Sequence, residues 1–174
     1  MFERFFETDV SKTLLAQRLV LGGVMLPHGA QKLLGWFGGY GFSGTMNYFT
    51  GVMHLPSVLA FLVIVSEAFG SLALLLGLGT RLAAFGAAAT MAGAALSTHV
   101  QVGFFMNWFG NQPGEGFEYH LLALALALPL VVRGGGAFAL DRGLLAALRL
   151  RRTRAQADTR SPAIDRRDLA DHAS

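Results

Sequence analysis

The chain has 174 residues, of which 53% are hydrophobic and only 14% charged, and its mean hydropathy is +0.47. Charged residues make up about 25% of an ordinary soluble domain, and here seven Arg and four Asp are concentrated in residues 149–174. The composition excludes disorder for the body of the chain and indicates a membrane protein rather than a soluble globule. The absence of cysteine excludes disulfides, cysteine-based zinc sites and thiol chemistry.

Residues 1–13 carry charges of both signs and are expected to form a cytoplasmic or interfacial segment. Four apolar stretches follow, and they predict transmembrane helices at about 14–36, 57–78, 82–102 and 118–133. A helix needs about 20 residues to cross a bilayer. The first three stretches are long enough, and the fourth crosses only if its ends extend or the bilayer thins locally. The apolar residues do not alternate as barrel strands do. We therefore expect an all-α integral membrane protein, a four-transmembrane-helix bundle over residues 14–134.

The orientation follows from Lys and Arg, which favour the cytoplasmic flanks of membrane spans. Basic residues precede the first span, Arg81 lies between the second and third, and a cluster of Arg follows the fourth. The loops 37–56 and 103–117 contain no Lys or Arg. Both termini are therefore expected in the cytoplasm, in a multi-pass protein of the bacterial plasma (inner) membrane.

The C-terminal region divides into two parts. Leu140, Leu144, Leu145 and Leu148 recur at helical spacing and predict an amphipathic interfacial helix over residues 139–150. Residues 151–174 lack apolar periodicity and are expected to form a disordered charged tail. The net charge of +3 comes mostly from this tail, and no basic motif with interleaved aromatics indicates nucleic-acid binding.

Ionisable residues inside membrane spans are costly and each needs a reason. Arg18 lies near the cytoplasmic end of the first span and is expected to snorkel to the surface. The others fall in the outer half of the predicted bundle and come from all four spans, which predicts an outward-facing polar pocket. An ion pair or hydrogen bond from Glu67 to His28 or to Lys32 would hold these groups in lipid. The proposed catalytic residues are His28, Lys32 and Glu67, and the proposed ligand-binding residues are Gln31, Trp36, Phe37, His99, Trp108, Glu118, Tyr119 and His120.

Several alternatives stay open for these residues. The polar groups are either a proton-handling or ligand-binding pocket or buried struts that fix helix packing. The aromatic, glycine-rich outer loops are either a membrane-surface belt or an apolar mouth for a planar ring, lined by Trp36, Phe37 and Trp108. His28, Glu67, His99 and His120 are suitable metal ligands, but no metal is expected because no HExxH or comparable spacing is present. His28 and His99 would be the best pair to hold a haem, which is not expected either. Gly39, Gly41 and Gly44 match GxGxxG, but the pattern follows a helix rather than a strand and so does not indicate dinucleotide binding.

Three segments carry a resemblance to a known family: PHGAQKLLGWFGG at residues 27–39, SEAFGSLALLLGLGTRLAA at 66–84 and EYHLLALALAL at 118–128. Over about residues 14–132 the sequence resembles the DoxX family of small bacterial membrane proteins. The resemblance implies a four-helix membrane protein related to a small subunit of thiosulfate:quinone oxidoreductase and to proteins linked to quinone, catechol or oxidative-stress defence. It also implies that the family's motif positions are His28, Gln31, Lys32, Gly35, Trp36, Glu67 and Tyr119.

The sequence thus predicts a membrane component of a quinone-linked oxidoreductase or redox-stress system. Ubiquinone or menaquinone would enter from lipid, with His28 and Lys32 hydrogen-bonding its carbonyls and Glu67 relaying protons. A protein partner would supply or accept electrons, and a homo-oligomer is compatible with the sequence. The alternatives are a non-catalytic membrane scaffold or lipid-binding subunit and, third, a small-molecule transporter.

Overall fold

The structure is a computed structural model that describes residues 6–160, and every regular element in this range is helical. The long helices are α2 (Lys12–Leu34), α6 (Thr80–Ala94), α7 (Glu118–Arg133) and α8 (Leu140–Arg160). The shorter helices are α3 (Gly41–Asn47), α4 (Ser57–Val65) and α5 (Ser71–Leu76), and η1 (Trp36–Gly38) is a 3₁₀ turn. Three π-helical segments complete the fold: η2 (Tyr48–Val52), η3 (Ser66–Gly70) and η4 (Ala95–His99).

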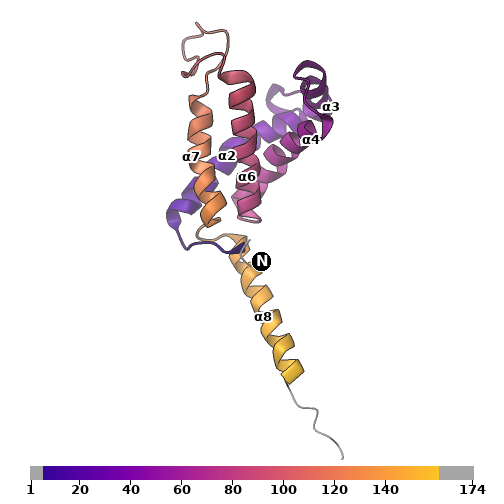
Figure 1. Cartoon of the computed structure of the whole chain (residues 1–174), viewed down its shortest axis with the longest axis vertical. Coiled ribbons are helices and arrows are strands. Elements are labelled where there is room, and N and C mark those ends of the chain that lie inside the picture. The colour runs from indigo at the N-terminus through magenta and orange to yellow at the C-terminus, as the bar shows by residue number, and fades with distance from the viewer. Residues whose placement is uncertain (1–5, 161–174) are drawn as a thin grey trace, which may run out of the picture.

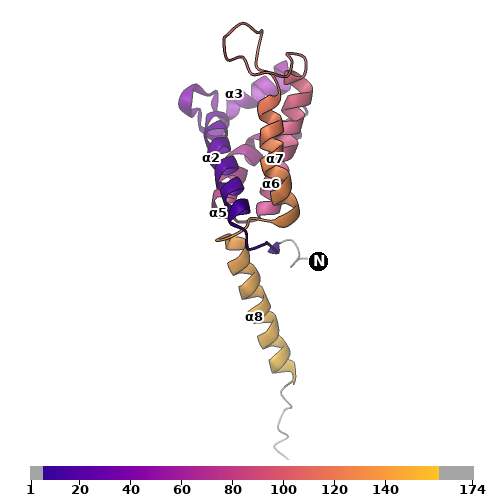
Figure 2. The ribbon, with the colours of Figure 1, turned by 90° about the vertical axis from the view of Figure 1, so that its left-hand side faces the viewer.

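Within the described range the elements form four helical passes. They are α2, the continuous helix Ser57–Leu76 made of α4, η3 and α5, then α6 with η4, and finally α7. Helix α2 packs against η3, α5 and α7, and α6 packs against η3 and α7. The backbone N–H of Asp9, just before α2, donates to the carbonyl of Arg133 at the end of α7. The beginning of the first pass and the end of the fourth therefore lie at the same end of the bundle (Figures 1 and 2).

The interior of the bundle is built largely from small side chains. Ala83, Ala84, Ala87 and Ala88 on α6 are buried, as are Ala123 and Ala127 on α7. Small residues let helices approach closely without a large apolar driving force, as in membrane bundles. Large apolar side chains instead point outward on every pass, among them Val58, Leu82, Leu96, Leu122 and Val132.

One helix in the described range, Ser57–Leu76, is long and apolar enough to cross a membrane by length and composition, with a mean hydropathy of 2.3. Helix α2 continues through Pro27 as one helix of 23 residues. The fourth pass spans Glu118–Arg133. The structure therefore shows an all-helical fold, in which one of the four passes meets this criterion for a membrane span.

The C-terminal region differs from the sequence expectation. Helix α8 runs from Leu140 to Arg160, so residues 151–160, expected in the disordered tail, are helical. It extends away from the bundle along the long axis of the molecule and does not lie across the bundle end (Figure 1). Residues 161–174 of the predicted tail lie outside the described residues.

Arg18 does not snorkel as the sequence predicted. Its side chain is 2% exposed, and its guanidinium donates to the carbonyls of Leu74 and Leu75, at 2.8 and 2.7 Å, and of Gly135 and Ala137, at 3.0 and 3.4 Å. The first two carbonyls belong to the last turn of α5, where a helix leaves its carbonyls without partners. Arg18 therefore joins α2, the end of α5 and the loop between α7 and α8.

Asp141, at the start of α8, also fixes this end of the bundle. It is 2% exposed and accepts hydrogen bonds from the backbone N–H groups of Gly79 and Thr80, at 2.6 and 3.0 Å. These are free N–H groups at the beginning of α6, where a carboxylate also complements the helix dipole. Asp141 thereby ties the start of α8 to the bundle.

Candidate functional site

The central polar feature is an ion pair between α2 and η3. The Lys32 ammonium lies 2.5 Å from a carboxylate oxygen of Glu67, and the side chains are 25% and 4% exposed. This confirms one of the two contacts predicted for Glu67. Because Glu67 is almost fully enclosed, its charge depends on Lys32, while Lys32 keeps one face open.

The backbone around Glu67 is unusual. Glu67 lies in the π-helical segment η3, and His99 lies in another, η4. Such segments interrupt α-helices rarely and occur frequently at functional sites. Two of the sequence-predicted site residues therefore stand on irregular helical turns.

A close helix crossing holds the ion pair in place. A Cβ atom added at Gly29 would come within 2.5 Å of the Cα of Ala68 and within 2.6 Å of the carbonyl carbon of Glu67. Only glycine permits this approach between α2 and η3. Gly29 is thus the contact that lets Lys32, one turn further along α2, reach Glu67.

A second polar cluster joins η4 to α7. The rings of His99 and His120 lie 4.2 Å apart, and the Tyr119 ring lies edge-on to His120 at 5.8 Å. His120 is 6% exposed and its Nδ1 has no hydrogen-bond partner within residues 6–160. The Nδ1 of His99 lies 2.8 Å from the carbonyl oxygen of Glu115.

The structure arranges these polar groups in two clusters. Lys32 on α2 and Glu67 on η3 form the ion pair, and His99 on η4 packs against His120 on α7, with Tyr119 beside His120. The sequence predicted a single pocket from depth alone.

The predicted aromatic mouth forms differently. Trp36 and Phe37 line an apolar groove of about 350 Å³ between α2 and the η3–α5 region, together with residues such as Pro27, Leu33 and Phe69. Gly29 and Ala68 line it, but neither Lys32 nor Glu67 does. Trp108 does not line it either; that side chain is 80% exposed in the 100–117 loop.

The remaining predicted residues have simpler surroundings. His28 is exposed on α2, one turn before Lys32, and its ring has no polar partner in the described part of the chain. The Gln31 amide donates to the carbonyl of Phe37 at 3.3 Å and so closes the turn after α2. The backbone N–H of Glu118 donates to Phe104, whereas its half-buried carboxylate has no partner among the described residues.

Sequence reasoning missed Arg18 and Asp141 as fixed groups. A charged residue within an apolar stretch was the available signal for Arg18. No signal in the sequence indicated that Asp141 is buried, because an acidic residue at the start of an amphipathic helix is usually a solvent-exposed helix cap. No group of three or more His, Asp or Glu side chains able to hold a metal ion occurs within residues 6–160.

Small side chains inside, large apolar side chains outside and a buried ion pair between passes define a class: helical proteins that associate with membranes. The chain belongs to the DoxX family, whose model matches residues 13–100 and so includes both partners of the ion pair. This family is membrane-associated.

A relative from Bacillus subtilis (strain 168), named "Putative oxidoreductase CatD", is 28% identical over 127 residues. The match covers 73% of this chain and 83% of the relative. No solved structure matches the chain.

Proposed function

We propose that the protein is a multi-pass component of a quinone-linked oxidoreductase in the bacterial plasma membrane. The four helical passes would span the bilayer, and the beginning of the first pass and the end of the fourth would both lie on the cytoplasmic side. The large apolar side chains on the outside of every pass support this, since patches of this extent are rare on soluble monomers. The name of the relative from Bacillus subtilis supports a redox role.

The observation that carries the proposal is the ion pair between Lys32 and Glu67, in which Glu67 is buried and Lys32 remains partly exposed. Lys32 is held by Glu67 but remains 25% exposed, and the unpartnered His28 ring lies one turn away on the same helix. Two hydrogen-bond donors at this spacing suit the carbonyl oxygens of a quinone ring. The groove beside Trp36 is apolar and offers no such donors, so we assign to it the isoprenoid tail rather than the ring.

The chemistry requires protons as well as electrons. Reduction of a quinone to a hydroquinone takes up two electrons and two protons. The electrons would come from a partner protein. Lys32 would donate a proton to one carbonyl oxygen and His28 would donate the second proton to the other, and Lys32 would regain its proton through Glu67.

The test is quinone binding by the purified protein. We expect ubiquinone or menaquinone to copurify with the wild-type chain in mild detergent and to be lost from His28→Leu, which lacks one of the two proposed hydrogen-bond donors. His28 is exposed, so its removal leaves no buried group unpaired and the variant should fold. The control is His54→Asn, which removes another exposed histidine and keeps a residue tolerant of its positive φ of 54°. Wild-type protein that holds no quinone, yet forms a stable complex with a partner, would favour the scaffold alternative.

A further inference from the structure

A second hollow lies at the end of the bundle from which α8 emerges. This end is at the beginning of α2, whereas Lys32 lies near the end of that helix. This basal groove has a volume of about 600 Å³. Its walls come from the segment before α2, the adjoining ends of α6 and α7, and one face of α8. The lining residues are Glu7, Thr8, Asp9, Val10, Arg81, Val132, Arg133, Arg142, Leu145, Ala146 and Arg149.

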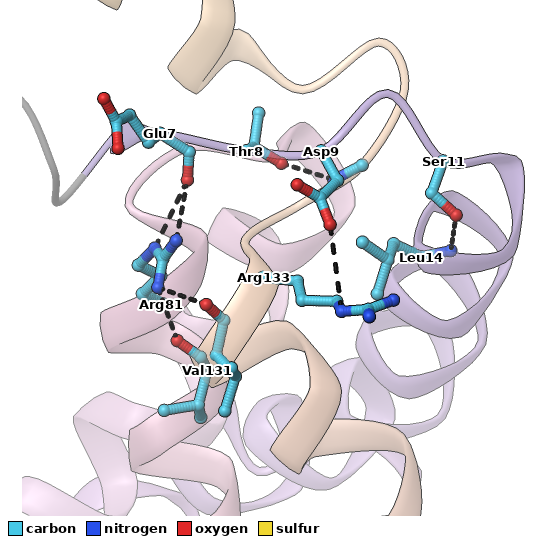
Figure 3. A network of polar contacts seen from close by, with 10 residues as sticks. Glu7, Thr8, Asp9, Ser11, Leu14, Arg81, Val131 and Arg133 are labelled. Atoms are coloured by element: carbon cyan, nitrogen blue, oxygen red, sulfur yellow. Dashed lines mark hydrogen bonds and ion pairs between the residues drawn. The ribbon is translucent and has the colours of Figure 1, made fainter.

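One wall of the basal groove is held by backbone hydrogen bonds. Arg81 donates to the carbonyl of Glu7 at 3.0 and 3.3 Å and to those of Val131 and Val132 at 3.1 and 2.5 Å (Figure 3). The Gly136 N–H donates to the Thr8 hydroxyl at 2.7 Å. The segment before α2 is thus fastened across the ends of α6 and α7, and the wall is preformed.

The opposite wall is a face of α8. Arg142, Leu145, Ala146 and Arg149 follow one another at i, i+3, i+4 and i+7, so their side chains share one side of the helix. Leu145 is 9% exposed and closes the bottom of this face. The arginines flank an apolar strip, and the groove therefore has both charged and apolar walls.

The charge of the groove is positive, with four arginines against two carboxylates. The two carboxylates form only exposed ion pairs. An Asp9 oxygen lies 3.8 Å from the Arg133 Nε, a Glu7 oxygen lies 3.3 Å from an Arg149 Nη, and all four side chains are at least half exposed. Ion pairs of this kind contribute little, so Arg133 is free to exchange its partner. The Arg142 side chain has no hydrogen bond or ion pair within the described residues.

We propose that the basal groove binds the headgroup phosphate of an anionic phospholipid in the cytoplasmic leaflet. Arg133 and Arg142 would hold the phosphate, since guanidinium groups bind phosphate oxygens in pairs. Val10, Val132 and Leu145 would contact the glycerol and the first carbons of the acyl chain. An amphipathic ligand matches this lining better than a free anion does, and the volume lies in the usual range for small-molecule sites. The inference uses the membrane orientation proposed above but not the quinone.

The experiment compares lipid binding by full-length variants of equal charge. Arg133→Gln/Arg142→Gln removes two arginines of the groove, and Arg151→Gln/Arg154→Gln removes two exposed arginines of α8 outside it. Each protein is reconstituted with mixed phosphatidylcholine and phosphatidylglycerol, and the enrichment of phosphatidylglycerol around it is measured by native mass spectrometry. Inorganic phosphate is added as a competitor in a parallel series.

We expect wild-type protein and the α8 variant to agree within about twofold and the groove variant to lose about tenfold in retained phosphatidylglycerol. Inorganic phosphate at millimolar concentration should not displace the lipid. An equal loss in both variants would mean diffuse surface charge, and no loss in either would mean no site. Displacement by inorganic phosphate would mean a site for the free anion. Each of these three results contradicts the proposal, and none bears on quinone binding.

Discussion

Removing either partner of the Lys32–Glu67 ion pair should destabilise the protein, and removing both should restore part of the loss. Lys32→Met leaves the Glu67 carboxylate enclosed at 4% exposure, without the cation that pairs with it. Glu67→Gln leaves an ammonium that is 25% exposed and still reaches water or headgroups. In the double variant no charge is left unpaired, so the two losses should not add.

The magnitudes follow from these exposures. Breaking a buried ion pair costs about 3–5 kcal/mol. We therefore expect about 3 kcal/mol for Lys32→Met, which leaves a buried carboxylate unpaired, and about 2 kcal/mol for Glu67→Gln, which leaves a partly exposed ammonium unpaired.

Thermal unfolding of the wild type, the two single variants and the double variant in detergent at pH 7 completes the cycle. We expect a coupling of at least about 2 kcal/mol at pH 7. Strictly additive losses would mean that the two side chains do not interact in the folded protein. Quinone binding by the double variant then separates the roles: a strut predicts that binding returns with stability, and a proton-handling site predicts that it does not.

Other predictions concern the packing and the orientation. Gly29→Ala should lower the free energy of unfolding by about 1–3 kcal/mol because it forces α2 from η3, whereas Gly23→Ala, with open space around it, should leave thermal stability unchanged or raised. Arg18→Met should cost about 3 kcal/mol by removing the hydrogen bonds that Arg18 donates to four carbonyls, and a chemical-denaturation midpoint equal to that of the wild type would refute its structural role. The chain lacks cysteine, so Thr50→Cys should react with an impermeant thiol reagent on intact cells and Thr153→Cys should not; the reverse pattern would invert the proposed orientation.

The polar site was predictable to the extent that depth in a helix determines position. A rise of about 1.5 Å per residue places His28 and Glu67 near one level, with Lys32 one turn further out, and the ion pair between Lys32 and Glu67 was one of two predicted contacts. The sequence could not choose between His28 and Lys32 as the partner of Glu67, because the two residues lie one turn apart on the same side of α2. The choice depends on where α2 crosses η3, which is at Gly29 and Ala68, and a lone glycine in a helix gives no indication of what it contacts.

Two errors have related causes. Arg18 was expected to snorkel, since its distance from the helix end is visible in the sequence but the carbonyls that surround it belong to residues 56–119 positions away. The end of α8 was placed too early because apolar periodicity stops after Leu150, whereas the helix continues to Arg160. Periodicity reports the packing of a helix face and not the length of an exposed helix.

Quinone titration of the purified protein tests the central claim most directly. Binding of a short-chain ubiquinone or menaquinone analogue is measured for the wild type and for Lys32→Met/Glu67→Gln, the variant expected to fold without the ion pair. The account predicts saturable binding by the wild type and at least about tenfold weaker binding by the double variant, corresponding to the loss of one charged hydrogen bond of about 1.5–3 kcal/mol. Equal affinity of the two proteins, or no saturable binding by either, would contradict it.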